Sequence, residues 1–177
     1  MNAPSAVDRM STGEAPFDFE QTFRAQYERI ARVIAGVVQD SARAEELAVE
    51  VFLKFWRNPQ AHGENANGWL YRAAVRKALD ELRRRNRRAR YEGLFRFRSP
   101  VPTPEEVRAA TEERARVRKV LGAMNPGPAE LLLLRSQGFS YQELASALDL
   151  NPASVGTLLS RAQEAFRKEF VKRYGPQ

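Results

Sequence analysis

One segment of the chain, residues 67–90, constrains the fold more than any other. Its first half repeats apolar side chains at three- and four-residue spacing, which predicts an amphipathic helix with one buried stripe. The stripe consists of Trp69, Leu70, Ala73, Ala74, Ala78, Leu79 and Leu82. From Arg83 the stripe ends and arginine becomes the dominant residue. We therefore expect a helix that packs along its first half and carries concentrated positive charge along its second.

This positive charge is local to one part of the chain. Residues 70–98 contain 11 Lys and Arg against three Asp and Glu, a net charge of +8 in a chain whose formal total is +7. A row of arginines repels itself unless acids or a bound polyanion offset it. The sequence pI of about 10.1 and the nearby tryptophans favour nucleic acid as that polyanion, over a membrane surface.

Composition limits the class of protein. The 177 residues are 43% hydrophobic and 29% charged, so we expect an all-α protein of two small helical domains, each with its own core. The chain has no cysteine, which excludes disulfides and thiolate metal sites. No apolar run approaches the ~18 residues of a membrane span, so we expect no membrane insertion and a cytoplasmic location.

Periodic and irregular segments alternate along the chain and predict its domain organisation. The first 16 residues are small and polar, and prolines accumulate after Arg90 where the helical periodicity is lost. The predicted divisions are a disordered leader (1–16), a first domain (17–94), a flexible linker (95–104) and a second domain (105–177).

Two helices are predicted ahead of the basic helix. The first covers Phe19–Val38, and the second runs from Ser41 to the Asn58-Pro59 pair, because the residue before a proline is pushed out of the helical region. One wide apolar stripe of the second helix is expected to pack inside the domain, namely Ala44, Leu47, Ala48, Val51, Phe52, Phe55 and Trp56. A polar loop over residues 60–68 then opens the basic helix.

The second domain is predicted to end in a helix-turn-helix. A charged helix over 104–123 and a short apolar helix over 129–136 come first. Ser140 and Glu143 form a capping box for a two-turn helix over Tyr141–Leu148. Asn151 and Pro152 then start a long last helix that runs to about Arg173. A two-turn helix, a tight turn and a proline-started long helix are typical of helix-turn-helix DNA-binding domains.

Three motifs, in this order, resemble the bacterial sigma-70 family, specifically its small two-domain extracytoplasmic-function group. The Ala44–Trp56 segment is similar to the family's core-polymerase-binding helix, and Trp69–Arg85 to its promoter-melting helix, which reads the −10 element. The Tyr141–Ala162 segment is similar to its −35 reading motif. The resemblance implies an RNA polymerase sigma factor that binds core polymerase and promoter DNA, and an anti-sigma partner that inhibits it. It implies no catalytic residue, metal ion or cofactor.

The resemblance assigns candidate roles to named residues. The polymerase-binding candidates are Glu45, Glu46, Glu50 and Lys54. The candidates for the −10 element and phosphates are Asn67, Tyr71, Arg72, Arg76, Lys77, Arg83, Arg84, Arg87 and Arg88. The −35 candidates are Ser154, Gly156, Thr157, Ser160 and Arg161. We expect Trp69 to lie in the core, Tyr71 to be more exposed as a base platform, and Gly156 to permit close approach to DNA.

Other classes of protein remain open alternatives. An autonomous helix-turn-helix regulator explains the second domain but leaves the first without a role, and such proteins usually dimerise. A general nucleoid or RNA-binding protein explains the arginines alone. An enzyme is disfavoured because the chain has one histidine, His62, in a loop where we expect it to be solvent-exposed, and its acids are spread along exposed faces.

Overall fold

The computed structural model describes residues 17–92 and 105–175, and side chains from 111 onward in the second of these ranges. Within these ranges every regular element is a helix, so the expected all-α fold is confirmed. The leader predicted over 1–16 and the linker predicted over 95–104 lie outside the described residues. None of the described helices combines the length and apolar character needed to cross a membrane.

The first half of the molecule is a bundle of α1 (Phe19–Val38), α2 (Ser41–Trp56) and α3 (Ala66–Glu92), with a 3-10 turn, η1 (Pro59–Ala61), before α3. Asp18 caps α1 by accepting a hydrogen bond from the Gln21 amide, and Asp40 caps α2 in the same way through the Arg43 amide. Gln39 ends α1 in the left-handed conformation, with φ of 56°. These local signals explain why the α1 and α2 bounds match the sequence prediction.

The second half contains α4 (Glu105–Ala123), α5 (Pro126–Ser136), α6 (Tyr141–Leu148), η2 (Pro152–Ser154) and α7 (Val155–Tyr174). The predicted capping box forms: the Glu143 amide donates to Ser140 Oγ, and the Ser140 amide donates to Glu143. Two predicted starts were wrong. The fifth helix begins at Pro126 because proline is accepted at a first helical position. The last α-helix begins at Val155, after a 3-10 turn capped by Asn151.

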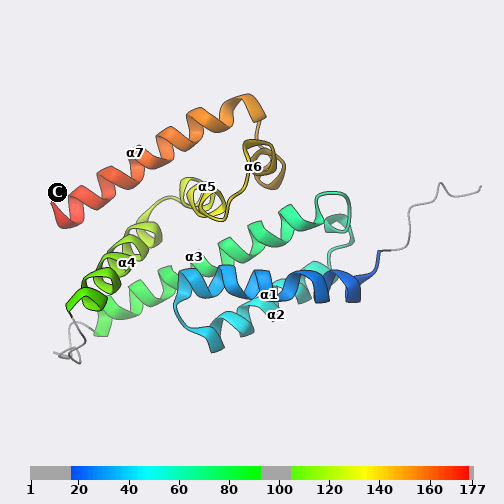
Figure 1. Cartoon of the computed structure of the whole chain (residues 1–177), viewed down its shortest axis with the longest axis horizontal. Helices are drawn as coiled ribbons and strands as arrows, with labels where there is room; N and C mark the ends of the chain where they lie inside the picture. The colour runs from blue at the N-terminus through cyan, green and yellow to red at the C-terminus, as the bar shows by residue number, and fades with distance from the viewer. Residues whose placement is uncertain (1–16, 93–104, 176–177) are drawn as a thin grey trace, which may run out of the picture.

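Helix α3 packs against both halves of the molecule. It packs against α1 and α2 on one side and against α4, α5 and α6 on the other, as the green helix in Figure 1 shows. Leu70, Val75 and Leu79 of α3 are fully buried. The buried side chains of the two halves consequently form one continuous cluster, where two separate cores were expected.

Candidate functional site

A buried carboxylate organises the middle of α3. Glu81 is 5% exposed and binds three guanidinium groups: Arg43 at 3.3 Å, Arg84 at 2.8 Å and Arg85 at 3.2 Å. Burial acts to raise the pKa of Glu81, but the hydrogen bonds from Arg84 and Arg85 and the charge of Arg43 together hold it below its usual value. The arginines at 84 and 85 therefore stabilise the fold in this arrangement.

Further basic residues of α3 also have partners within the protein. Arg85 additionally donates to the Val38 carbonyl at 2.9 Å, which ties α3 to the end of α1. Lys77 binds Glu50 of α2 at 2.5 Å. Arg83 contacts Asp80 at 3.3 Å and the Met124 carbonyl at 3.4 Å. Among the DNA-binding candidates, Lys77, Arg83 and Arg84 are thus engaged intramolecularly.

Arg87 and Arg88 differ in their surroundings from the paired basic residues of α3. Both lie exposed on the last turns of α3, and neither has a hydrogen-bond or ion-pair partner among the residues the structure describes. An exposed, unpaired guanidinium is free to bind a phosphate without losing an existing contact. Among the named DNA-binding candidates of the arginine row, these two are available to a polyanion.

The N-terminal half of α3 faces the second half of the molecule. The Tyr71 ring packs edge-on against Phe139 with centroids 5.0 Å apart, so Tyr71 is half-buried and less exposed than expected. Arg76 Nε lies 2.9 Å from a carboxylate oxygen of Glu130, a buried residue of α5. Asn65 donates to the Ser146 carbonyl of α6 at 2.7 Å. Sequence spacing gave no sign of these contacts.

A cavity of about 460 Å³ lies at this junction. Asn67 and Tyr71 line it from α3, and Gln137 and Phe139 line it from the second half. Gln26 of α1 also lines it, and its Oε1 atom is buried without a hydrogen-bond partner. Such an atom represents an unsatisfied acceptor, which a ligand with an N–H group would satisfy. A second buried atom without a hydrogen-bond partner, Nε of the half-buried Arg72, lies on α3.

The outer face of α2 carries an apolar stripe that the sequence prediction missed. Val49, Leu53 and Trp56 are spaced by four and three residues, so they share one helix face, and their exposed fractions are 43%, 44% and 58%. Trp56 was predicted to pack in the core. It lies outward because Phe55 already fills the core position beside it, with 0% exposure.

The acidic docking candidates divide into two groups. Glu45 is exposed on α2 without a described partner, and Glu46 is exposed but binds Arg43 at 2.6 Å. Glu50 is only partly exposed, because it binds Lys77. Lys54 is exposed and lines a small cavity of about 190 Å³ beside Trp69 and Lys77. Glu45 is therefore the carboxylate on this face that a partner can bind without breaking an ion pair, and Glu46 is exposed but shared with Arg43.

The helix-turn-helix presents small polar residues at the end of η2 and on the first turns of α7. Thr157, Ser160 and Arg161 are exposed, Ser154 and Gly156 are half-buried, and Arg161 has no partner among the described residues. A Cβ atom added at Gly156 would have only an ordinary contact, 3.5 Å from the Tyr141 ring. The first turns of α7 therefore accept side chains sterically, so the protein's own packing does not require the glycine.

Two aromatic residues near α3 have structural roles. Trp69 packs against Phe55 with ring centroids 5.5 Å apart and is half-buried, so it lies at the edge of the core, where a core position was expected. His62 was expected to be exposed and is not: its Nε2 atom lies 2.8 Å from the Phe55 carbonyl, and its ring stacks on Phe17 at 3.8 Å. A histidine held on both sides in this way is a packing residue of the loop before α3.

Comparison with known proteins connects this geometry to a family. The family model for Sigma-70 region 2 matches residues 22–88, and the model for Sigma-70, region 4 matches residues 114–165. The protein named "Probable RNA polymerase sigma factor RfaY" from Xanthomonas campestris is 28% identical over 82% of this chain. The match covers only 38% of the length of that relative. "ECF RNA polymerase sigma factor SigE" of Mycolicibacterium smegmatis is 26% identical over 91% of this chain and 68% of its own length.

A solved structure supports the fold. The sigma factor RpoE from Bartonella quintana, in complex with the anti-sigma factor NepR, matches with a TM-score of 0.50 and 19% identity, covering 86% of this chain and 96% of that one. The two region models lie in the order in which the first bundle and the helix-turn-helix occur here. The chain therefore belongs to the extracytoplasmic-function group of the sigma-70 family of RNA polymerase sigma factors.

Proposed function

We propose that this protein binds bacterial core RNA polymerase through α2, reads promoter DNA through α3 and α7, and so directs transcription initiation. The proposal is carried by α3: this helix holds the unpaired arginines Arg87 and Arg88 near one end, and an amide and an aromatic ring, Asn67 and Tyr71, at the other. Phosphate binding and capture of an unstacked base require those two features in one element. The proposed place of action is the cytoplasm.

The polymerase-facing surface consists of Glu45, Glu46, Val49, Leu53 and Trp56. An exposed apolar stripe rimmed by charged side chains is typical of protein–protein contacts, and tryptophan is a common energetic centre in them. Glu50 is peripheral to this surface, because its carboxylate is held by Lys77, and Lys54 is peripheral because it borders the small cavity beside Trp69. The acidic rim favours a basic partner surface.

Promoter reading requires α3 to separate from α5 and α6. In the closed arrangement Phe139 covers Tyr71 and Glu130 holds Arg76, so neither candidate is free to contact a base or a phosphate. An anti-sigma factor that binds the closed form would inhibit the protein by this route. The Bartonella relative was solved in complex with an anti-sigma factor, NepR, which supports the same partner class here.

At the −35 element, α7 brings short side chains and one long donor, Arg161, to the major groove. Ser154, Thr157 and Ser160 reach only a short distance, so we propose that recognition depends on groove shape and close approach at Gly156. Along α3, Asn67, Tyr71 and Arg72 face the captured base, while Arg87 and Arg88 bind phosphates. Arg76, Lys77, Arg83 and Arg84 contribute only after their intramolecular partners release them.

A crosslink tests the requirement for separation. The chain has no cysteine, so Asn65→Cys with Ser146→Cys gives a single pair that a short bismaleimide can join across the α3–α6 contact. The crosslinked protein is expected to lose promoter-dependent transcription with core polymerase, whereas the same double variant without crosslinker retains it. Full transcription by the crosslinked protein would contradict the proposal. Tight promoter binding without polymerase would favour an autonomous regulator instead.

A further inference from the structure

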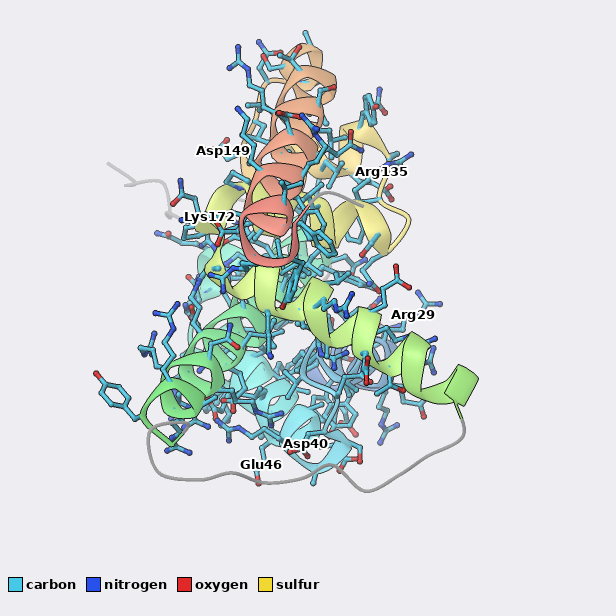
Figure 2. All side chains as sticks on the ribbon, turned by 90° about the vertical axis from the view of Figure 1, so that its left-hand side faces the viewer. Arg29, Asp40, Glu46, Arg135, Asp149 and Lys172 are labelled. Carbon is cyan, nitrogen blue, oxygen red and sulfur yellow. The ribbon has the colours of Figure 1, made fainter. Side chains whose placement is uncertain are left out.

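A groove lies at the other end of the molecule, between the C-terminal parts of α3, α4 and α7. Its volume is about 660 Å³. Figure 2 looks onto this end of the molecule and labels Lys172, which α7 contributes to the groove. Six basic side chains line it, together with one acid, Glu169: Arg83, Arg87, Arg90, Lys119, Lys172 and Arg173. We call this feature the basic groove.

The charges of the basic groove are not balanced within the protein. Glu169 is bound to Arg173 at 2.7 Å, so its carboxylate is already engaged. The other groove cations include four that have no acid partner among the described residues, namely Arg87, Arg90, Lys119 and Lys172. Like charges gathered from three separate helices oppose the packing that brings them together unless an anion lies between them. The four cations therefore give the groove an unbalanced positive charge, which favours binding of an anion.

The size and chemistry of the groove define the class of anion that it can bind. A volume of this order falls in the ~300–1,000 Å³ range of small-molecule sites, and a nucleic-acid duplex is far larger. No aromatic side chain is among its lining residues, so a base would find no stacking surface there. Guanidinium and ammonium groups are the usual ligands of phosphate oxygens. Gly122 lets α4 approach α3 closely beside the groove, since a Cβ atom there would come within 2.6 Å of Asn86 Nδ2.

We propose that the basic groove binds a small anion that carries several phosphate groups in a chain, either free polyphosphate or the phosphate chain of a nucleotide. Because α3 lies on one side and α4 and α7 on the other, the bound anion holds the two halves of the molecule together. It therefore stabilises the closed arrangement in which Arg76 and Tyr71 are covered, and it opposes promoter binding.

The test measures binding of inorganic tripolyphosphate to the full chain by calorimetry and thermal shift, at constant ionic strength. We expect saturable binding and a raised melting temperature. Lys119→Glu with Lys172→Glu supplies the groove with its own carboxylates, so it should weaken the affinity at least tenfold. A parallel titration with adenosine triphosphate separates the two sources: equal affinity indicates that the phosphate chain alone is recognised, and tighter binding indicates a nucleotide.

Matched controls separate this site from general attraction to a basic protein. Arg32→Glu with Arg57→Glu removes the same charge from exposed positions outside the groove and should leave the affinity within about threefold, because salt screens distant charges beyond about 8 Å. An equal loss in this control, or orthophosphate binding as tightly as tripolyphosphate, would overturn the proposal. An equal loss of affinity for a random DNA duplex in the groove variant would assign the groove to DNA instead.

Discussion

The ion pair between Arg76 and Glu130 links the two halves of the protein, and its removal gives a quantitative prediction. Arg76→Ala leaves the Glu130 carboxylate, which is 5% exposed, without its partner. Breaking a fully buried pair costs about 3–5 kcal/mol. The Arg76 side chain is 51% exposed, so solvent screening roughly halves this cost. We expect the closed arrangement to lose about 2 kcal/mol relative to the separated one.

A change of this size shifts the ratio of closed to separated molecules by a factor of about 30. The measurement is energy transfer between dyes on Arg32→Cys in α1 and Lys168→Cys in α7, which the cysteine-free chain makes specific. The separated population should rise in Arg76→Ala. In a Glu130→Gln background the same substitution should cost much less, because no buried carboxylate is left unpaired.

Either of two results would contradict this coupling between Arg76 and Glu130. The first is a separated population in Arg76→Ala that matches the wild-type protein. The second is an equal effect of Arg76→Ala in both backgrounds, which would show that Glu130 does not couple to Arg76. In that case the two halves are held together mainly by the apolar contacts of α3 with α5 and α6.

Four further predictions follow from single features of the structure. Glu81→Gln should destabilise the fold at neutral pH and reduce the further loss of stability on acidification. Folding lowers the pKa of Glu81, so this carboxylate stabilises the fold above its unfolded pKa of about 4.5, and the stabilisation is lost as pH falls through the lower folded pKa. Acid titration of both proteins, monitored by circular dichroism, measures the difference. Trp56→Ser should weaken capture of core polymerase at least tenfold with an unchanged melting temperature; normal capture would remove α2 from the interface. Arg87→Ala with Arg88→Ala should flatten the logarithmic salt dependence of duplex binding by about two, for all sequences alike, and a loss confined to one promoter would mean that these arginines read bases. Gly156→Lys should raise the stability of α7 by up to about 1 kcal/mol, since its Cβ meets only an ordinary contact at 3.5 Å, and should weaken or redirect promoter choice; stronger binding to the same promoters would refute close approach.

Much of the fold is readable from local sequence. The α1, α2 and α6 bounds match their predictions because each begins at a side-chain cap within four residues of its own start, such as Asp40 or Ser140. The starts of α5 and α7 were misjudged where proline allows an earlier turn or a 3-10 turn. Helix starts that carry a side-chain cap can therefore be predicted from a single sequence, and starts at a proline are predicted less accurately.

Which arginines pair within the protein and which remain unpaired cannot be predicted from the sequence in the same way. Arg84 and Arg87 are alike in sequence, but Arg84 reaches the buried Glu81 one turn earlier while Arg87 faces the groove. The Arg76–Glu130 pair joins positions 54 residues apart, and only the packing of α5 on α3 brings them together. Trp56 lies at the edge of the apolar stripe, where the helix rotation set by Phe55 decides which side is exposed.

Transcription in vitro tests the central claim most directly. The assay combines bacterial core polymerase with this protein on a library of promoter fragments, with Trp56→Ser as the matched variant. The account predicts transcripts with defined start sites that appear only when the wild-type protein is added and that fall at least tenfold with Trp56→Ser. Stable binding to promoter fragments with no transcripts and no association with core polymerase would contradict it.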